Sequence, residues 1–229
     1  DTEGAQRSQV EILDVVGPLE VFASATRWLR AQDAAAPGYA VEVLATRRGP
    51  VRTQSGLTIG ADRAWPQVRG GLDTLLVAGG MGTRRAMFDR ALQAWLRRMA
   101  PRVRRFGAVC SGSFILAEAG LLDGRRATTH WNHCAELARR YPAVRVEPDP
   151  IFVRDGAVYT SAGVTAGMDL ALALVEEDHG RDVAMQVARQ LVLFLRRPGG
   201  QSQFSVQLTV QAAERAPLCD LQAWIAEHP

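Results

Sequence analysis

The fold is decided by the stretch Arg105–Ala117, RFGAVCSGSFILA, where a short apolar run stops at Cys110 and a helix-forming run begins at once. The segment Phe106–Val109 is typical of a buried strand in a parallel sheet. Ser111-Gly112-Ser113 supplies small residues that cap helices, and the alanine-rich run Phe114–Leu122 has the composition of a helix packed on a sheet. The stretch therefore predicts a strand, a sharp turn and a helix.

Cys110 lies at this turn, and two interpretations of it are open. A side chain on such a turn projects outward, and the dipole at a helix N-terminus favours the thiolate. The first interpretation therefore predicts an exposed, reactive thiol with a lowered pKa. In the second, Cys110 is a small buried hydrophobic residue at the end of a strand.

Strand-like and helix-like segments alternate along the chain, which predicts an α/β fold with a largely parallel sheet. Such sheets bind ligands at the carboxyl ends of their strands, where both Gly79-Gly80 and Cys110 fall, so these residues are expected to share a crevice. Asp155-Gly156 between two apolar runs predicts a hairpin. Strands are expected at 39–46, 74–80, 105–109, 126–130, 144–146, 151–153 and 157–161, and helices at 92–99, 114–122, 168–177 and 183–195.

Composition excludes several classes of protein. Three cysteines at unrelated spacings form neither a disulfide framework nor a zinc pattern, which predicts a reducing compartment, the cytoplasm, and no metal or cofactor. No apolar run is long enough to span a membrane. The formal net charge is +3, and many of the arginines fall between residues 84 and 105. We interpret that cluster as a solvated helix face, with a patch for nucleic acid or an acidic partner as the alternative: Arg84, Arg85, Arg90, Arg97, Arg98, Arg102, Arg104 and Arg105.

The pattern changes near the end of the chain. Pro198-Gly199-Gly200 stops the preceding helix, a further helical segment is expected at 205–215, and Leu218–Pro229 begins an amphipathic helix and then stops. These breaks predict a main domain over 1–198, a linker with a helix over 199–217, and the start of a truncated second domain over 218–229. The alternative is a terminal helix docked on the main core.

Several motifs in a fixed order resemble the DJ-1/PfpI-like, class I glutamine amidotransferase-like superfamily, and within it the sensor half of AraC-type transcriptional regulators. The motifs are LDVVGPLEVF at 13–22, Gly79-Gly80, AVCSG at 108–112, AEAGLLDGRRATTHW at 117–131, TSAG at 160–163, AGMD at 166–169 and PGGQSQF at 198–204. The resemblance implies a flavodoxin-like three-layer sandwich. It also implies that 218–229 begin a helix-turn-helix domain through which a homodimer would bind DNA. In this superfamily a strand normally precedes Asp14, whereas residues 1–9 are polar.

The same resemblance suggests roles for individual residues. Cys110 would be a nucleophile, the amides of Gly80 and Ser111 would form an oxyanion hole, and His130 would serve as base, because Ser111 replaces the histidine that follows the cysteine in proteases of the superfamily. Asp14 would act with the cysteine, as an aspartate does in isonitrile hydratases. His130 is otherwise a pocket-lining residue, and Asp14 a turn or helix-cap residue. The candidate ligand-binding residues are Asp14, Gly80, Met81, Cys110, Ser111, His130 and Gly163.

Two functions therefore compete. The first is a non-enzymatic, ligand-sensing and dimerising domain of a transcriptional regulator, with a pocket around Cys110 that binds a small-molecule effector or senses an oxidant. The second is a cysteine-dependent hydratase, hydrolase or glyoxalase-like enzyme. The interrupted tail favours the regulator, since an enzyme does not need it. Two surfaces are candidates for the dimer: the arginine-rich helix around Trp95 and the segment after Gln201.

Overall fold

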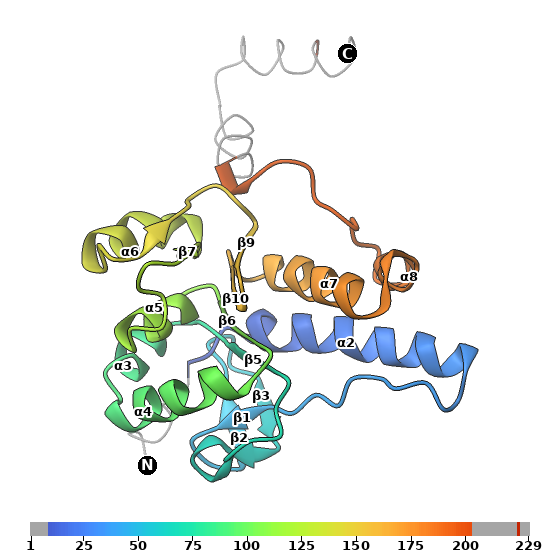
Figure 1. Cartoon of the computed structure of the whole chain (residues 1–229), viewed down its shortest axis with the longest axis horizontal. Coiled ribbons are helices and arrows are strands. Elements are labelled where there is room, and N and C mark those ends of the chain that lie inside the picture. The colour runs from blue at the N-terminus through green and yellow to red at the C-terminus, as the bar shows by residue number, and fades with distance from the viewer. Residues whose placement is uncertain (1–8, 203–223, 225–229) are drawn as a thin grey trace.

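The computed structural model describes residues 9–202 and Trp224, and it is built around a four-stranded sheet (Figure 1). The strand order is β5 (Thr74–Val77), β6 (Arg105–Val109), β10 (Val158–Ser161) and β9 (Phe152–Asp155). β5, β6 and β10 run parallel, and β9 pairs antiparallel with β10. The predicted α/β fold with a mainly parallel sheet is confirmed, and so is the hairpin at Asp155-Gly156.

Helices cover both faces of this sheet and complete three layers (Figure 1). Val158 and Tyr159 on β10 show the division, because neighbouring residues of a strand point to opposite faces: Val158 joins the core beneath α4 and α5, and Tyr159 joins the core beneath α2, α7 and α8. The helices are α2 (Ile12–Gln32), α7 (Ala166–His179) and α8 (Arg181–Gln190) on one face, and α4 (Arg90–Met99) and α5 (Gly112–Glu118) on the other.

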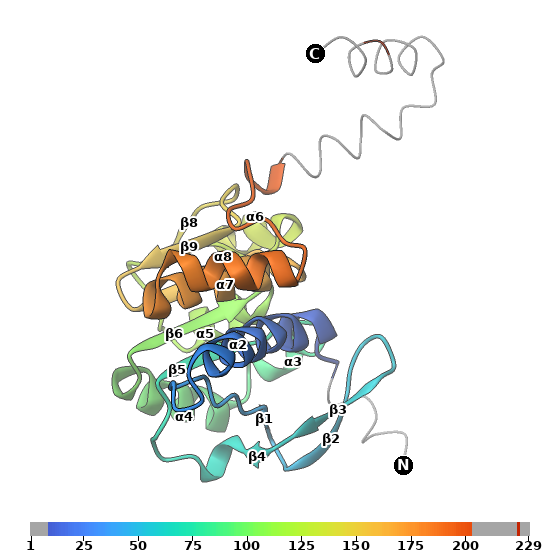
Figure 2. The same ribbon diagram turned by 90° about the vertical axis from the view of Figure 1, so that its right-hand side faces the viewer.

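Shorter elements surround the sandwich (Figure 2). They comprise two parallel strand pairs, one hairpin, two short helices and three 3-10 turns. These are β1 (Leu44–Ala45) with β4 (Arg63–Ala64), β7 (Arg126–Ala127) with β8 (Arg145–Val146), the hairpin of β2 (Gly49–Arg52) and β3 (Thr58–Ala61), α3 (Thr83–Ala86), α6 (Cys134–Arg140), η1 (Trp65–Gln67), η2 (Ala100–Arg102) and η3 (Trp131–His133).

Several predicted elements are shorter than expected. The strands expected at 74–80 and 126–130 end at Val77 and Ala127, and the helix expected at 114–122 ends at Glu118. Of the strand expected at 39–46, only β1 pairs with another strand. The helix expected at 183–195 ends at Gln190 because Val192 adopts a left-handed backbone (φ 54°). There the amide of Leu193 turns back to the carbonyl of Ala188 at 2.8 Å, a helix-ending geometry that glycine usually provides. A valine in this role carries no signal in the sequence.

The resemblance implies a strand before Asp14; of the polar residues 1–9 that precede it here, residues 1–8 lie outside the described part of the chain. Residues 9–11 lie across the carboxyl end of β5: Val10 bridges to Thr53, and the Glu11 amide donates to the Gly79 carbonyl at 3.0 Å. Among the described strands, β5 is therefore at the edge of its sheet, and its four residues are only partly buried.

Part of the arginine cluster has a structural role. Arg105 is only 3% exposed and donates to Asp178 at 2.6 Å. Arg104 pairs with Asp73 at 2.9 Å and with Asp178 at 2.8 Å. The interpretation of the whole cluster as a solvated face is thus wrong for Arg105, whose counter-charge comes from the distant end of α7. Local sequence could not reveal that partner.

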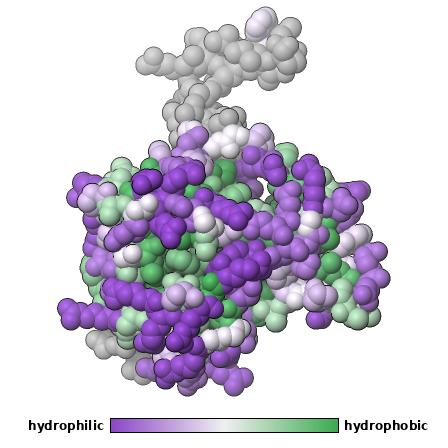
Figure 3. All heavy atoms as spheres, in the orientation of Figure 1, coloured by the Kyte–Doolittle hydropathy of each residue, from purple (hydrophilic) through white to green (hydrophobic). Residues whose placement is uncertain are grey.

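Trp95, in the arginine-rich helix α4, is itself buried and donates through its indole to the Val68 carbonyl at 2.9 Å. Hydrophilic side chains occupy much of the face shown in Figure 3. None of the helices in the described ranges has the length and apolar character that a membrane crossing requires.

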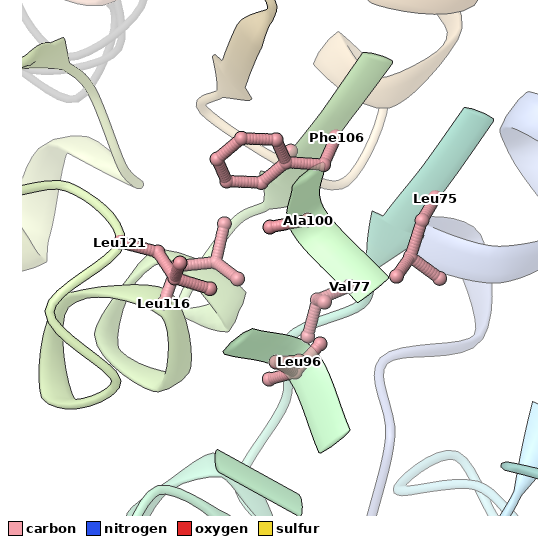
Figure 4. Close-up of a pocket in the computed structure, with 8 residues that line it drawn as sticks. Leu75, Val77, Leu96, Ala100, Phe106, Leu116 and Leu121 are labelled. Carbon is pink, nitrogen blue, oxygen red and sulfur yellow. The ribbon is translucent and has the colours of Figure 1, made fainter. Parts of the chain in front are cut away.

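Two of the hollows among the described residues are lined by residues other than Cys110. The first lies between the sheet and helices α4 and α5, where apolar side chains from both layers face one another (Figure 4). Its gaps are too narrow to hold a water molecule, so it is a packing defect rather than a ligand site. The second is an open groove of about 550 Å³ between α2 and α8, beside Trp28.

Candidate functional site

Cys110 sits on a strained turn that several hydrogen bonds hold in place. Its φ of 55° is left-handed, which is rare for a residue other than glycine. Its amide donates to the Ser161 carbonyl at 3.0 Å, and its carbonyl accepts from the hydroxyls of Thr129 (2.8 Å) and Ser113 (3.1 Å). A Cβ added to Gly163 would lie 2.1 Å from the Cys110 Cβ, so only glycine fits against this turn. The predicted strand–turn–helix arrangement is confirmed.

Asp14 joins two loops beside the turn. It is 4% exposed, in the first turn of α2. Its Oδ2 accepts from the Gly79 amide at 3.0 Å, after β5, and its Oδ1 accepts from the Val164 amide at 2.7 Å, after β10. Val164 is strained as well, with φ 52°. Asp14 is therefore an anchor of the site, and the helix-cap alternative is wrong because Glu11 caps α2.

The electrostatics of Asp14 and Cys110 differ from the sequence prediction. Burial raises the pKa of Asp14 from 3.8 to about 6, although the amides of Val164 and Gly79 favour its charge. Burial and then the Asp14 carboxylate raise the pKa of the Cys110 thiol to about 12, against the smaller opposing effect of hydrogen bonds from Ser111. Cys110 is only 9% exposed. The prediction of an exposed thiol with a lowered pKa is therefore wrong, because burial and a like charge outweigh the helix N-terminus.

Ser111 occupies the position where an oxyanion hole was expected. The Gly80 amide donates to the Ser111 Oγ at 2.9 Å, and the Thr83 hydroxyl lies 3.1 Å from the same oxygen. Residues 9–11 also pack over Gly80, where an added Cβ would lie 2.4 Å from the Gln9 carbonyl oxygen. In this arrangement the Gly80 amide already has an acceptor, so a substrate oxygen would have to displace the Ser111 hydroxyl.

His130 lies beside the site without a described bond to the thiol. Its ring packs against Trp131 and His133, with centroids 5.5 and 5.9 Å away. Burial and then His133 lower its pKa, which weakens it as a base. Within the described residues, its buried Nδ1 has no hydrogen-bond partner. The fold thus brings Asp14 and Cys110 together, but among the described residues no contact makes His130 their base.

The remaining predicted residues fall at the rim or support the turn. Met81 is 69% exposed, and its amide donates to Gln54 at 3.2 Å. Sequence reasoning missed Thr129, which holds the Cys110 carbonyl, and Val164, which donates to Asp14. Thr129 lies inside a motif that carried the resemblance, so its position was a usable signal. No cluster of three metal-ligating side chains occurs among the described residues.

Comparison with known proteins agrees with this architecture. Residues 6–177 match the DJ-1/PfpI family. The HTH-type transcriptional regulator CdhR of Pseudomonas aeruginosa is 41% identical over 160 residues, which cover 70% of this chain and 47% of that protein. Isonitrile hydratase of Pseudomonas putida is 36% identical over 183 residues, which cover 80% of this chain and 74% of that protein. The matched part of the chain thus spans about half the length of the regulator.

Two solved structures share the fold. A ThiJ/PfpI family protein from Pseudomonas syringae gives a TM-score of 0.70 at 30% identity, covering 83% of this chain and 74% of that one. An AraC family transcriptional regulator from Pseudomonas putida gives a TM-score of 0.69 at 24% identity, covering 80% and 95%. At this low sequence identity, the match supports a shared fold and nothing further. Taken together, the motifs, the fold and these matches show that the chain belongs to the DJ-1/PfpI family.

Proposed function

We propose that residues 1–198 form the ligand-sensing and dimerisation domain of an AraC-type transcriptional regulator. Residues 199–217 would link this domain to a helix-turn-helix domain that begins at 218–229. Apart from 199–202 and Trp224, those two segments lie outside the described residues. The regulator CdhR, 41% identical over most of this chain, supports the class of protein.

The protonation state of Cys110 is the observation that favours a sensor over an enzyme in this proposal. A cysteine nucleophile reacts as its thiolate and needs a base and an oxyanion hole. Here burial and Asp14 raise the pKa of the thiol to about 12, and the Gly80 amide already bonds to Ser111. A mostly protonated thiol also weighs against oxidant sensing. We therefore favour reversible binding of a small molecule around Asp14, Cys110 and Gly163, with Met81 and His130 at its edge.

A DNA-binding experiment tests this proposal. We expect the product of the whole native gene to exceed 24.9 kDa by roughly one small domain, on the order of a hundred residues, and to shift its own promoter DNA in a gel. Residues 1–229 alone should bind the same DNA poorly, because the reading helices of the second domain are incomplete. A native product of 24.9 kDa, or tight and sequence-specific binding by residues 1–229, contradicts the proposal.

The alternative is a cysteine-dependent hydratase. Two observations favour it: the 36% identity to isonitrile hydratase, and a buried carboxyl whose pKa of about 6 suits proton transfer near neutral pH, beside the thiol. Turnover of a small isonitrile by residues 1–229 separates the two functions. A rate that Cys110→Ala abolishes, while the control Cys134→Ala retains it, supports the enzyme. No turnover above the rate in buffer supports the sensor.

A further inference from the structure

The chain leaves α8 and crosses the top of the sandwich (Figures 1 and 2). Gln201 and Ser202 then hydrogen-bond to Asp149. The Gln201 amide donates to the Asp149 carbonyl at 2.6 Å. The Ser202 amide and hydroxyl donate to Asp149 Oδ1 at 3.0 and 2.5 Å. This attachment is the last described point before the segment that would lead to a DNA-binding domain.

The side chain of Gln201 is inserted into the body of the domain. It is 3% exposed, although glutamine is mostly a surface residue and loses considerable rotamer freedom when fixed. Its Nε2 lies 3.1 Å from the Thr128 hydroxyl, 3.1 Å from the Thr129 carbonyl and 3.0 Å from the Pro150 carbonyl. Within the described residues its Oε1 is buried without a hydrogen-bond partner. This costs free energy in the docked state, in which Gln201 is inserted, so the difference in free energy between the docked and undocked states is reduced.

The two threonines that hold Gln201 also hold the turn at Cys110. The Thr129 hydroxyl donates to the Cys110 carbonyl at 2.8 Å, and the Ser113 hydroxyl donates to the Thr128 carbonyl at 2.9 Å. A single two-residue segment thus contacts the turn on one side and the departing chain on the other. His130, the next residue, carries a second buried polar atom without a described partner.

We propose that Gln201 is a coupling latch: a change at the Cys110 turn shifts Thr128 and Thr129 and so alters how firmly the chain docks at Gln201 and Ser202. The coupling between the Cys110 turn and Gln201 does not depend on the proposed function. Only its effect on DNA binding rests on the proposed sensing function. Coupling of this kind requires that the two docking states differ in affinity for what binds at Cys110, and it must act in both directions.

The forward test uses residues 1–229 with and without alkylation of Cys110 by iodoacetamide. Hydrogen exchange of the Ser202 amide should become about tenfold faster after alkylation, because the docked state is disfavoured. Cys110→Ala treated in the same way controls for reaction at the other cysteines and should show no change. Ser202 exchange that stays slow after complete alkylation means that Gln201 is a static clamp, and it overturns the proposal.

The reverse test measures alkylation of Cys110 after the latch is broken. Gln201→Ala should accelerate it, whereas Gln32→Ala, at an exposed glutamine at the end of α2, should not. Asp149→Ala removes the Ser202 acceptor from an exposed position and tests the latch without opening the core; it should also accelerate alkylation. Unchanged rates in both latch variants overturn the coupling. Because neither test involves DNA, a failure of the latch is distinguishable from a failure of the regulator.

Discussion

Replacing Asp14 by asparagine removes a buried charge but keeps the size of the side chain, and we expect its effect on stability to depend on pH. Burial raises the pKa of Asp14 from 3.8 to about 6 in the folded chain. At about 1.4 kcal/mol per pKa unit, this shift of about 2 units corresponds to about 3 kcal/mol.

The sign follows from which state holds the proton more tightly. The folded chain does, so the contribution of Asp14 to stability is fully present below pH 3.8 and is lost as the pH rises through about 6. Asparagine does not titrate. The free energy of unfolding of Asp14→Asn, relative to that of the natural chain, should therefore increase by about 2–2.5 kcal/mol between about pH 4 and pH 7, which is most of the full effect.

Urea unfolding between pH 4 and pH 8 measures this difference, provided that the dependence on urea concentration is the same for both chains. Asp123→Asn, at an exposed position, is the matched control and should show no such trend. A difference between Asp14→Asn and the natural chain that stays constant across this range would refute the argument, since the carboxyl would then carry no burial cost.

The remaining predictions concern packing and ion pairs. Gly163→Ala should destabilise the fold by about 2–5 kcal/mol, because it adds about 1–2 kcal/mol of left-handed strain and about 1–3 kcal/mol of overpacking against Cys110; thermal unfolding measures it, and an unchanged midpoint would be incompatible with this turn. Asp178→Asn should cost about 3–5 kcal/mol, because it weakens the pairing of the buried Arg105 charge. Arg27→Ala, which breaks an exposed ion pair, should cost at most about 1 kcal/mol; similar losses in the two variants would contradict the difference in burial.

The elements of the sheet were predictable because their signals are local. Cys110 followed by small residues and an alanine-rich run predicts a turn into a helix whatever the rest of the chain does, and Asp155-Gly156 predicts its hairpin in the same way. Helix α8 shows the limit of this reasoning. Its apolar periodicity continues past Gln190, but the helix ends where Val192 adopts a left-handed backbone, which the local preference of valine does not predict.

Charges at the site were less predictable because their partners are distant in the sequence. Asp14 lies 65 residues from Gly79 and 150 from Val164, and these amides decide its role. The counter-charge of Arg105 comes from Asp178, 73 residues away. Placement at a helix N-terminus correctly located Cys110, but the pKa of the thiol depends on burial, which the local motif does not contain.

Asp14 connects the geometry of the site to its chemistry. The carboxylate holds the loops after β5 and β10 around Cys110, and its charge disfavours a second negative charge on the sulfur. Moving the proton from the thiol to Asp14 costs free energy, because the pKa of the thiol is about 12 and that of Asp14 is about 6. This gap corresponds to a cost of at most about 8 kcal/mol. An enzyme with this site would need substrate binding to remove much of that cost before its chemistry began. A sensor needs only a pocket whose loops are held in place. The charged Asp14 carboxylate does this by accepting the amides of Gly79 and Val164.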